Sequence, residues 1–270
     1  MRVAEDNGSG RLVRSAVEMS EHGPFADAGV ANDVDDRSRT FISYYTYGAA
    51  VALALDLSLR DLSGGRLSLD DYMARLWRDF GQSVAAPGLV ARPYSLADLR
   101  ATLAALTANQ AFADTFFDRF VEGREVADYA HLLGLAGYTL RRVAPDRAWT
   151  GPVAIREESG GLQIGRGSEG REGLVPFGTP AYEAGIDTGD LITTIDSQAA
   201  TMTAWIGLTR RRPGEMVRLG VTRRDGTRGM LTLTLGSDPA VQVVSKDATG
   251  APLTAAERAF RDAWLSNKAR

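Results

Sequence analysis

Three tyrosines are the side chains of this sequence best suited to hydrogen-bonding chemistry. Tyr44, Tyr45 and Tyr47 lie within four residues, directly before a run rich in alanine and leucine that is typical of a buried helix. A phenol, whose pKa is about 10, stays protonated at neutral pH and can donate a hydrogen bond to an oxyanion that forms during a reaction. Tyrosines at the start of a helix also commonly fill the edge of a core. The pattern by itself leaves both interpretations open.

The sequence offers few metal ligands. Its two histidines, His22 and His131, are 109 positions apart, and it contains no cysteine. Neither histidine belongs to an H-x-x-x-H pair, the spacing that places two imidazoles on one face of a helix for zinc binding. The lack of cysteine also excludes disulfides and thiolate metal sites. We therefore predict no metal site and no cofactor within this chain.

A stretch that begins at Gly178 reads GTPAYEAGIDTGDLI and predicts a short helix, a tight turn and a buried strand. Pro180 suits the first helical position, where a backbone donor would be unpaired anyway. Gly185 can take the left-handed conformation that ends a helix, and Gly189 then redirects the backbone into the strand. The run resembles the G-[ST]-P-A-x-x-A-G-[LI]-x-x-G-D-x-[IL] signature of bacterial PDZ domains. We therefore predict a PDZ domain over residues 149–238.

This resemblance implies a mode of binding, in which an extended peptide is added beside the second strand of the module and against a helix. A glycine-rich loop before that strand would offer backbone N–H groups to the carboxylate of a peptide or protein C-terminus. The candidate residues in the loop, strand and helix are Gly160, Gly161, Leu162, Gln163, Ile164, Met202, Trp205 and Ile206. The polar segment 165–172 could cover part of the groove. The alternative is a PDZ-like module that only braces a neighbouring domain.

One motif in this region is misleading. Residues 165–170 read GRGSEG and match G-x-G-x-x-G, the fingerprint of dinucleotide-binding folds. A dinucleotide site requires a helix that begins at this loop, so that the helix N-terminus meets the pyrophosphate. The next residues, Gly173-Leu174-Val175-Pro176, predict a strand instead, so we reject a nucleotide site.

The elements that must position the tyrosines are helices. The pattern predicts an all-helical region over residues 1–148, with one long, buried helix at 43–60. Further helices begin at Ser68 and Ser95, each of which has an aspartate three residues later that can complete a capping box. The helix after Ser68 should bury Leu69, Tyr72, Met73, Leu76, Trp77 and Phe80.

After residue 150 the pattern changes to short strands separated by glycine turns. We predict strands at 153–156, 162–164, 174–177, 191–196, 217–222 and 229–235, and a helix at 202–211. Residues 239–270 should form a linker and a docking tail helix, which Thr254 and Glu257 cap. The predicted fold class is α+β: a helical region, a PDZ domain resembling a β-barrel, and a C-terminal helix.

Four segments together resemble the glycyl aminopeptidase family of zinc metallopeptidases, whose thermolysin-like (gluzincin) catalytic domain precedes a C-terminal PDZ domain. They are Glu18-Met19-Ser20, Ile42-Ser43-Tyr44-Tyr45-Thr46-Tyr47-Gly48, Leu55-Asp56-Leu57-Ser58-Leu59-Arg60 and Phe116-Phe117-Asp118-Arg119-Phe120-Val121-Glu122-Gly123. The resemblance covers nearly the whole chain from residue 10 onward. It implies that Tyr45, three residues before Gly48, donates to the substrate oxyanion. Tyr44 is the less favoured alternative, and Tyr47 should pack in the core.

The sequence departs from this family at the metal site. The family binds zinc through H-E-x-x-H on one helix and a glutamate on a later helix, and the motif glutamate acts as general base. This chain has no such motif. We therefore interpret it as the C-terminal portion of such a peptidase, inactive alone, with zinc belonging to the complete family enzyme. The alternatives are a non-catalytic PDZ scaffold that binds peptides and an accessory protein that completes a partner.

Composition restricts the partners and the compartment. The net charge of −3 provides no general attraction to nucleic acid or to an anionic membrane. No apolar run suits a signal peptide or a transmembrane helix, so we predict a soluble protein of the cytoplasm or periplasm. The expected partners are a peptide or protein C-terminus and, in the first interpretation, the missing N-terminal catalytic part.

Overall fold

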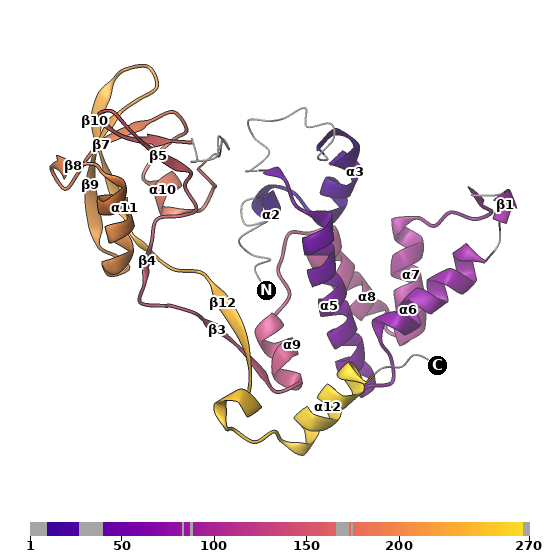
Figure 1. Ribbon diagram of the computed structural model, residues 1–270. Coiled ribbons are helices and arrows are strands. Elements are labelled where there is room, and N and C mark those ends of the chain that lie inside the picture. The colour runs from indigo at the N-terminus through magenta and orange to yellow at the C-terminus, as the bar shows by residue number, and fades with distance from the viewer. Residues whose placement is uncertain are drawn as a thin grey trace.

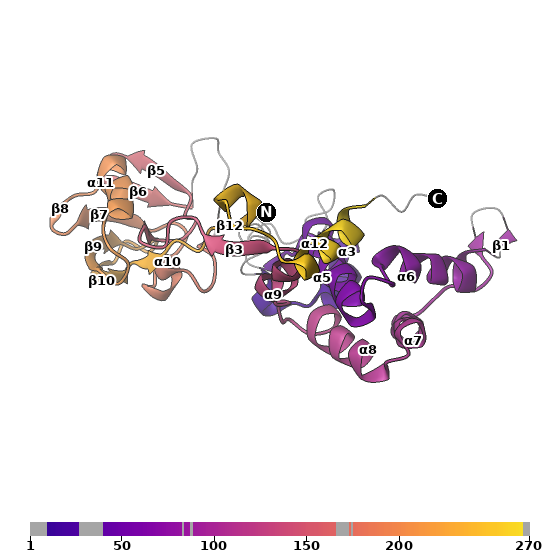
Figure 2. The ribbon, with the colours of Figure 1, turned by 90° about the horizontal axis from the view of Figure 1, so that it is seen from below.

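Most of the helices lie at one end of the molecule, and the largest sheet lies at the other end (Figures 1 and 2). The computed structural model describes residues 10–26, 40–82, 84–86, 89–165, 173 and 175–266. Strands β3, Tyr138–Arg142, and β12, Val241–Ser245, form an arm that joins the two ends. Within the described ranges, each helix is too short or too polar to cross a lipid bilayer.

The centre of the helical part is α5, Tyr44–Ser63. The Ser43 side chain caps its start, and Gly64 ends it in the left-handed conformation with a φ of 63°. Neighbouring helices cover more than one side of α5, as its apolar run predicted. Its buried residues are Tyr47, Ala50, Ala54, Leu55, Leu57, Leu59, Arg60 and Ser63.

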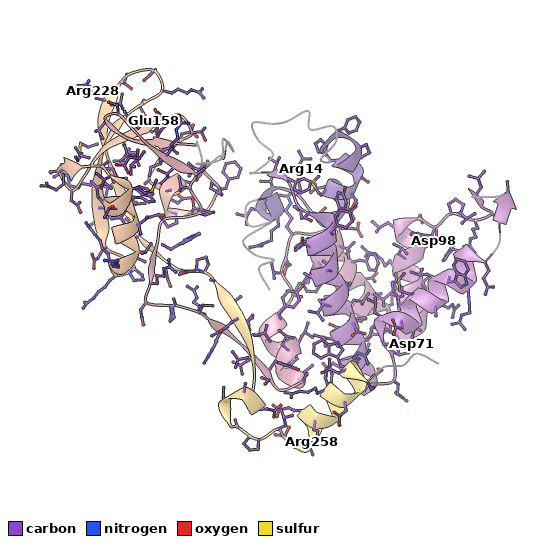
Figure 3. All side chains as sticks on the ribbon, in the orientation of Figure 1. Arg14, Asp71, Asp98, Glu158, Arg228 and Arg258 are labelled. Carbon is purple, nitrogen blue, oxygen red and sulfur yellow. The ribbon has the colours of Figure 1, made fainter. Side chains whose placement is uncertain are left out.

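Shorter elements surround α5. They are α2 Gly10–Val13, α3 Ala16–Ala26, α6 Leu69–Leu76, η1 Trp77–Gly81, α7 Leu96–Thr107, α8 Gln110–Phe116, η2 Phe117–Val121 and α9 Tyr129–Leu135. The predicted caps are present, because the Ser68 and Ser95 N–H groups donate to Asp71 and Asp98 at 2.8 and 2.9 Å (Figure 3 labels the two aspartates). The prediction of an all-helical region is wrong in detail. Strands β1 Val84–Ala86 and β2 Leu89–Val90 form a hairpin, and β3 follows α9.

The helix after Ser68 buries fewer residues than its spacing predicted. Tyr72 and Phe80 are buried, but Met73 and Trp77 keep 56% and 62% of their surface exposed. Both exposed residues lie at the margin of the predicted apolar stripe, and α6 packs mainly against α5 and α7. The chain also continues from α6 into the π-helical turn η1, which changes the angular spacing of its side chains.

The other part of the molecule is a sheet with the strand order β10-β9-β7-β6-β5, in which β8 also pairs with β7. The strands are β5 Ile155–Glu158, β6 Gly161–Ile164, β7 Leu191–Ile195, β8 Gln198–Ala199, β9 Met216–Thr222 and β10 Arg228–Thr234. All pairs in this sheet are antiparallel. Among the described residues the end strands β10 and β5 do not pair with each other, so the sheet is open and the expected barrel is not confirmed.

Helices α10, Pro180–Glu183, and α11, Met202–Gly207, with the turn η3, Leu208–Arg210, complete this part. Pro180 is the first residue of α10, and Gly185 and Gly189 take the predicted positive φ angles of 77° and 91°. Helix and sheet share one core, formed by Leu162, Ile164, Val175, Ala181, Ile186, Ile192, Ile195, Trp205, Leu208, Val217, Leu219, Val221, Leu233 and Leu235. The predicted strand at 174–177 is not observed over residues 175–177, where Val175 enters the core from an irregular segment.

The C-terminal segment belongs to the helical part as well as to the arm. After the pairing of β4 Ala148–Trp149 with β11 Gly236–Ser237, β12 runs back along β3 and leads through η4 Asp247–Thr249 to α12 Ala255–Leu265. In α12, Phe260 and Trp264 pack against the core of the helical part. The predicted linker therefore contains a strand, and the tail helix docks on the helices that precede the sheet.

Candidate functional site

Tyr45 lies on the first turn of α5, where it keeps 78% of its surface exposed. Ser43 orders this turn, because its Oγ accepts the Thr46 N–H at 3.3 Å. The Tyr45 ring lies against the Tyr44 ring with the ring centres 4.9 Å apart. The structure therefore presents an accessible phenol at the start of a helix whose middle is largely buried.

The other two tyrosines of the group are less accessible. Tyr47 is only 7% exposed and packs with Met19 and Ile42, which confirms the prediction that it belongs to the core. Burial raises the pKa of Tyr47 above its usual value, so this phenol stays neutral. Tyr44 is half-buried beside α3, since a Cβ atom on Gly23 would lie 3.8 Å from its ring.

Helix α3, which packs against α5, begins with a capping box of its own. The Ser15 N–H donates to Glu18 Oε2 at 2.6 Å, and the Glu18 N–H donates to Ser15 Oγ at 3.1 Å. The Ser15 N–H, and to a lesser degree Arg124, hold the pKa of Glu18 below its usual value. Glu18 is thus a negatively charged structural residue of α3.

The two histidines lie on different helices. His22 lies on α3 with its ring centre 6.0 Å from that of Phe25, whereas His131 lies on α9 and lines a cavity of about 480 Å³ between α5, α9 and α12. The described ranges bring no three histidine or carboxylate side chains together in an arrangement that could hold a metal ion. The side chains that the structure describes therefore do not fit a zinc site.

The predicted peptide-binding strand lies inside the sheet. Strand β6 pairs with β5 through Ile155 and Ile164 on one side, and with β7 through Leu162 and Ile192 on the other. Leu162 and Ile164 are buried in the core. An added strand therefore cannot pair along β6, and this part of the sequence interpretation is wrong. The reason is that the preceding strand folds back onto β6 as a hairpin.

The two predicted loop glycines serve this hairpin. Gly160, with a φ of 94°, lies in the two-residue turn between β5 and β6. Gly161 follows with a φ of 152° and is buried where β6 crosses β7. A Cβ atom on Gly161 would lie 2.1 Å from the Ile192 carbonyl oxygen. Turn geometry and close backbone approach explain both glycines.

We expect Gly161→Ala to destabilise the protein by about 3 kcal/mol, because alanine is strained at this φ and its methyl group would collide with the Ile192 carbonyl. Urea unfolding followed by tryptophan fluorescence measures the change. Gly229→Ala is the matched control, since a Cβ atom there meets nothing within 4 Å, and we expect a change below about 0.5 kcal/mol. Equal stabilities of the two variants would contradict this account of Gly161.

The exposed edge nearest to the candidate helix belongs to β5. Among the described residues β5 pairs with β6 alone. The start of α11 lies beside it, because the Met202 N–H donates to Glu157 Oε2 at 3.0 Å. Sequence reasoning placed a strand here but missed that it forms the edge, since a strand pattern does not reveal the order of strands in a sheet.

The three predicted residues of α11 have different environments. Trp205 belongs to the core of the sheet part, and Met202 is partly buried against the same core. Ile206 is 55% exposed. Met202 and Ile206 therefore keep accessible surface, whereas Trp205 anchors the helix in the core. Of the predicted cover 165–172, only Gly165 lies within the described ranges.

The fold of the whole chain is similar to that of an aminopeptidase N family protein from Idiomarina loihiensis, with a TM-score of 0.63 and 22% sequence identity. The match covers 98% of this chain and 42% of that protein, so the chain spans less than half of its relative. At this identity the similarity establishes the fold.

Two partial similarities to protease and PDZ structures have low TM-scores. The HtrA-type protease AlgW with a decapeptide has a TM-score of 0.29 and 27% identity, over 35% of this chain and 30% of that one. The HtrA3 PDZ domain bound to a phage-derived ligand has a TM-score of 0.24 and 17% identity, over 43% of this chain and 100% of that one. No protein-family model and no curated protein matches the sequence.

Proposed function

We propose that this chain is the C-terminal portion of a zinc metallopeptidase that resembles the glycyl aminopeptidases and removes N-terminal residues from peptides. Two findings support the proposal: the accessible Tyr45 on the first turn of α5, and a fold similar over 98% of the chain to an aminopeptidase N family protein. The exposed tyrosine is the observation on which the catalytic assignment depends.

Tyr45 would stabilise the oxyanion that forms when water attacks the carbonyl of the N-terminal peptide bond. A phenol donates one hydrogen bond without losing its proton, and the loss of one such donor typically slows a reaction by about 10²–10³-fold. The Tyr44 ring contacts the Tyr45 ring, and the Ser43 cap orders the helical turn that carries Tyr45. Residue Tyr44, half-buried beside α3, is the less favoured donor.

The proposal assigns zinc to the part of the longer protein that this chain does not supply. When bound there, the metal would polarise the substrate carbonyl and lower the pKa of water. The described histidines and carboxylates do not fit such a site, so we derive no step through the metal from this chain. The 270-residue chain alone should accordingly be inactive.

We expect Tyr45→Phe, introduced into the complete protein, to lower kcat for a glycyl anilide by about 10²-fold, with KM changed less than about threefold. The reason is that the lost hydrogen bond forms in the transition state only. Initial rates over a range of substrate concentrations give both constants. The 270-residue chain alone provides the negative control.

Tyr47→Phe is the matched variant for this experiment. It removes a phenol hydroxyl two residues away, on a side chain buried against Met19 and Ile42. We expect its kcat to stay within about twofold of the original value. Unchanged turnover in Tyr45→Phe would assign Tyr45 to packing, and chelator-sensitive hydrolysis by the chain alone would contradict the proposed division of the enzyme.

The edge of β5 supports a second function, the binding of an extended peptide or protein terminus as an added strand. Unpaired backbone groups of an edge strand and side chains of a neighbouring helix are what this mode of binding requires. Within the enzyme this edge would position or sense substrate. In a non-catalytic scaffold, peptide binding at this edge would be the main function. An in-frame H-E-x-x-H codon sequence upstream of Met1 would favour the enzyme, and a start signal at Met1 would favour the scaffold.

A further inference from the structure

The hydrogen-bond register of β5 shows which residues face its open edge. The Gly165 N–H donates to the Ala154 carbonyl at 2.8 Å, and Arg156 pairs with Gln163. In an antiparallel ladder, residues alternate between those that exchange hydrogen bonds with the partner strand and those that do not. Because residues 154, 156 and 158 face β6, the backbone groups of Ile155 and Glu157 point toward the opposite edge.

The side chains of β5 alternate between the two faces of the sheet. Ile155 packs partly against the core, and the Glu157 carboxylate on the same face accepts the Met202 N–H of α11 at 3.0 Å. Arg156 and Glu158 occupy the opposite face, where they form an ion pair (Figure 3 labels Glu158). Glu157 is therefore the carboxylate that lies both on the open edge and on the face of α11.

We propose that Glu157 sets the specificity of the β5 edge, selecting extended peptides that carry a lysine or arginine at the position paired with Glu157. This inference rests on the proposed peptide binding. A residue directly opposite Glu157 in an added strand would have its Cβ about 5 Å away and its side chain on the α11 face. Glu157 is exposed, and its Oε1 atom is left to accept from the ligand when Oε2 receives the Met202 N–H.

The size of the preference follows from cross-strand charge pairs. Opposite charges on directly opposed residues raise the affinity of the added strand about threefold. Like charges lower the affinity by a similar factor. We therefore expect a lysine peptide to bind about threefold more tightly than a glutamine peptide and about tenfold more tightly than a glutamate peptide. Higher salt should reduce both ratios, because the pair is exposed.

The test uses fluorescein-labelled eight-residue peptides of alternating valine and threonine, with free C-termini. A single lysine, glutamine or glutamate replaces each position in turn, so that the register need not be known beforehand. Fluorescence polarisation with the full 270-residue chain gives the dissociation constants. We expect the affinity at one position to decrease in the order lysine, glutamine, glutamate. Positions two residues away from it should show the same order more weakly.

Glu157→Gln keeps an amide oxygen that can accept the Met202 N–H, so it removes the charge while preserving the cap on α11. We expect it to abolish the preference while binding of the glutamine peptide persists. Glu158→Gln, on the opposite face, should retain the preference. Peptide binding without charge preference, or a preference that survives in Glu157→Gln, would overturn this inference and leave peptide binding intact. A failure of every peptide to bind would instead contradict the proposed peptide binding, and this inference with it.

Discussion

Removal of residues 251–270 is expected to destabilise the helical part by about 5 kcal/mol, although this segment follows the sheet part in the sequence. Helix α12 contributes Phe260 and Trp264 to the core around α5. The Trp264 ring lies 6.1 Å from that of Tyr138, edge to face. The buried Arg60 would also lose the Ala263 carbonyl, which now accepts its Nη1–H at 2.6 Å. Loss of this much stability approaches the total for a domain, so thermal unfolding by circular dichroism should show a lowered midpoint or no cooperative transition.

Excision of the sheet part is the control for this truncation. The Val143 N–H donates to the Ala240 carbonyl at 2.8 Å, so the ends of the arm lie close enough for a two-residue Asn-Gly turn to replace residues 144–239. We expect the helical part to unfold cooperatively after this larger deletion. Its stability should fall only modestly, because Leu12 of α2 approaches Gly178 of the sheet part and this contact is lost. Equal losses of stability from the two deletions would contradict the assignment of the tail to the helical part.

Arg60→Met is expected to destabilise the helical part by about 3 to 5 kcal/mol, because it leaves a buried carboxylate without its cation. The Arg60 and Asp56 side chains are only 6% and 13% exposed, and their Nε and Oδ2 atoms lie 3.0 Å apart. Asp56 Oδ1 also accepts the Leu69 N–H at 2.9 Å, so the pair joins α5, the start of α6 and α12. Urea unfolding followed by circular dichroism measures the change.

The chain contains a matched exposed pair for comparison. Arg75 and Asp79 have the same i,i+4 spacing, but their side chains are 42% and 34% exposed. Arg75→Met should change stability by less than about 1 kcal/mol, since water screens and solvates an exposed pair. Losses of similar size in the two variants would refute the buried network. In the chain truncated at residue 250, Arg60→Met should lower the free energy of unfolding by less than it does in the full chain. The reason is that the Ala263 carbonyl, one acceptor of Arg60, is already absent.

Arg261 shows how the tail also fixes the base of the arm. Its Nε–H and Nη2–H donate to the carbonyls of Ala136 and Gly137 at 2.7 and 3.0 Å, at the end of α9 where β3 begins. The same guanidinium pairs with Asp247, which follows β12, and lies 4.5 Å from the centre of the Tyr138 ring. One side chain of α12 thus holds both strands of the arm. Arg258 on the same helix is exposed (Figure 3).

Local signals were sufficient for several features of this fold. The capping pairs at Ser68, Ser95 and Thr254 begin helices where the sequence predicted them. Gly185 and Gly189 have the positive φ angles that the turn requires. In each case the interacting groups lie within a few residues, so the spacing along the chain is also the spacing in space.

Tertiary structure decided the features that depend on distant partners. Strands β3 and β12 were missed because Tyr138 pairs with Ser245 across the whole sheet part, and neither short segment carries a strong pattern alone. The exposure of Met73 and Trp77 depends on which side of α6 has neighbours.

For the candidate site, the sequence by itself determined the tyrosine group, the scarcity of metal ligands and the presence of a strand near residue 155. The expected burial of Tyr47 is confirmed, but only the folded chain decided how far Tyr45 is exposed. It also decided that β5 rather than β6 forms the open edge among the described strands. Residue type and spacing specify local hydrogen bonds and apolar faces. Exposure and strand order depend instead on which distant segments cover those faces, and that information lies in the packing of the whole chain.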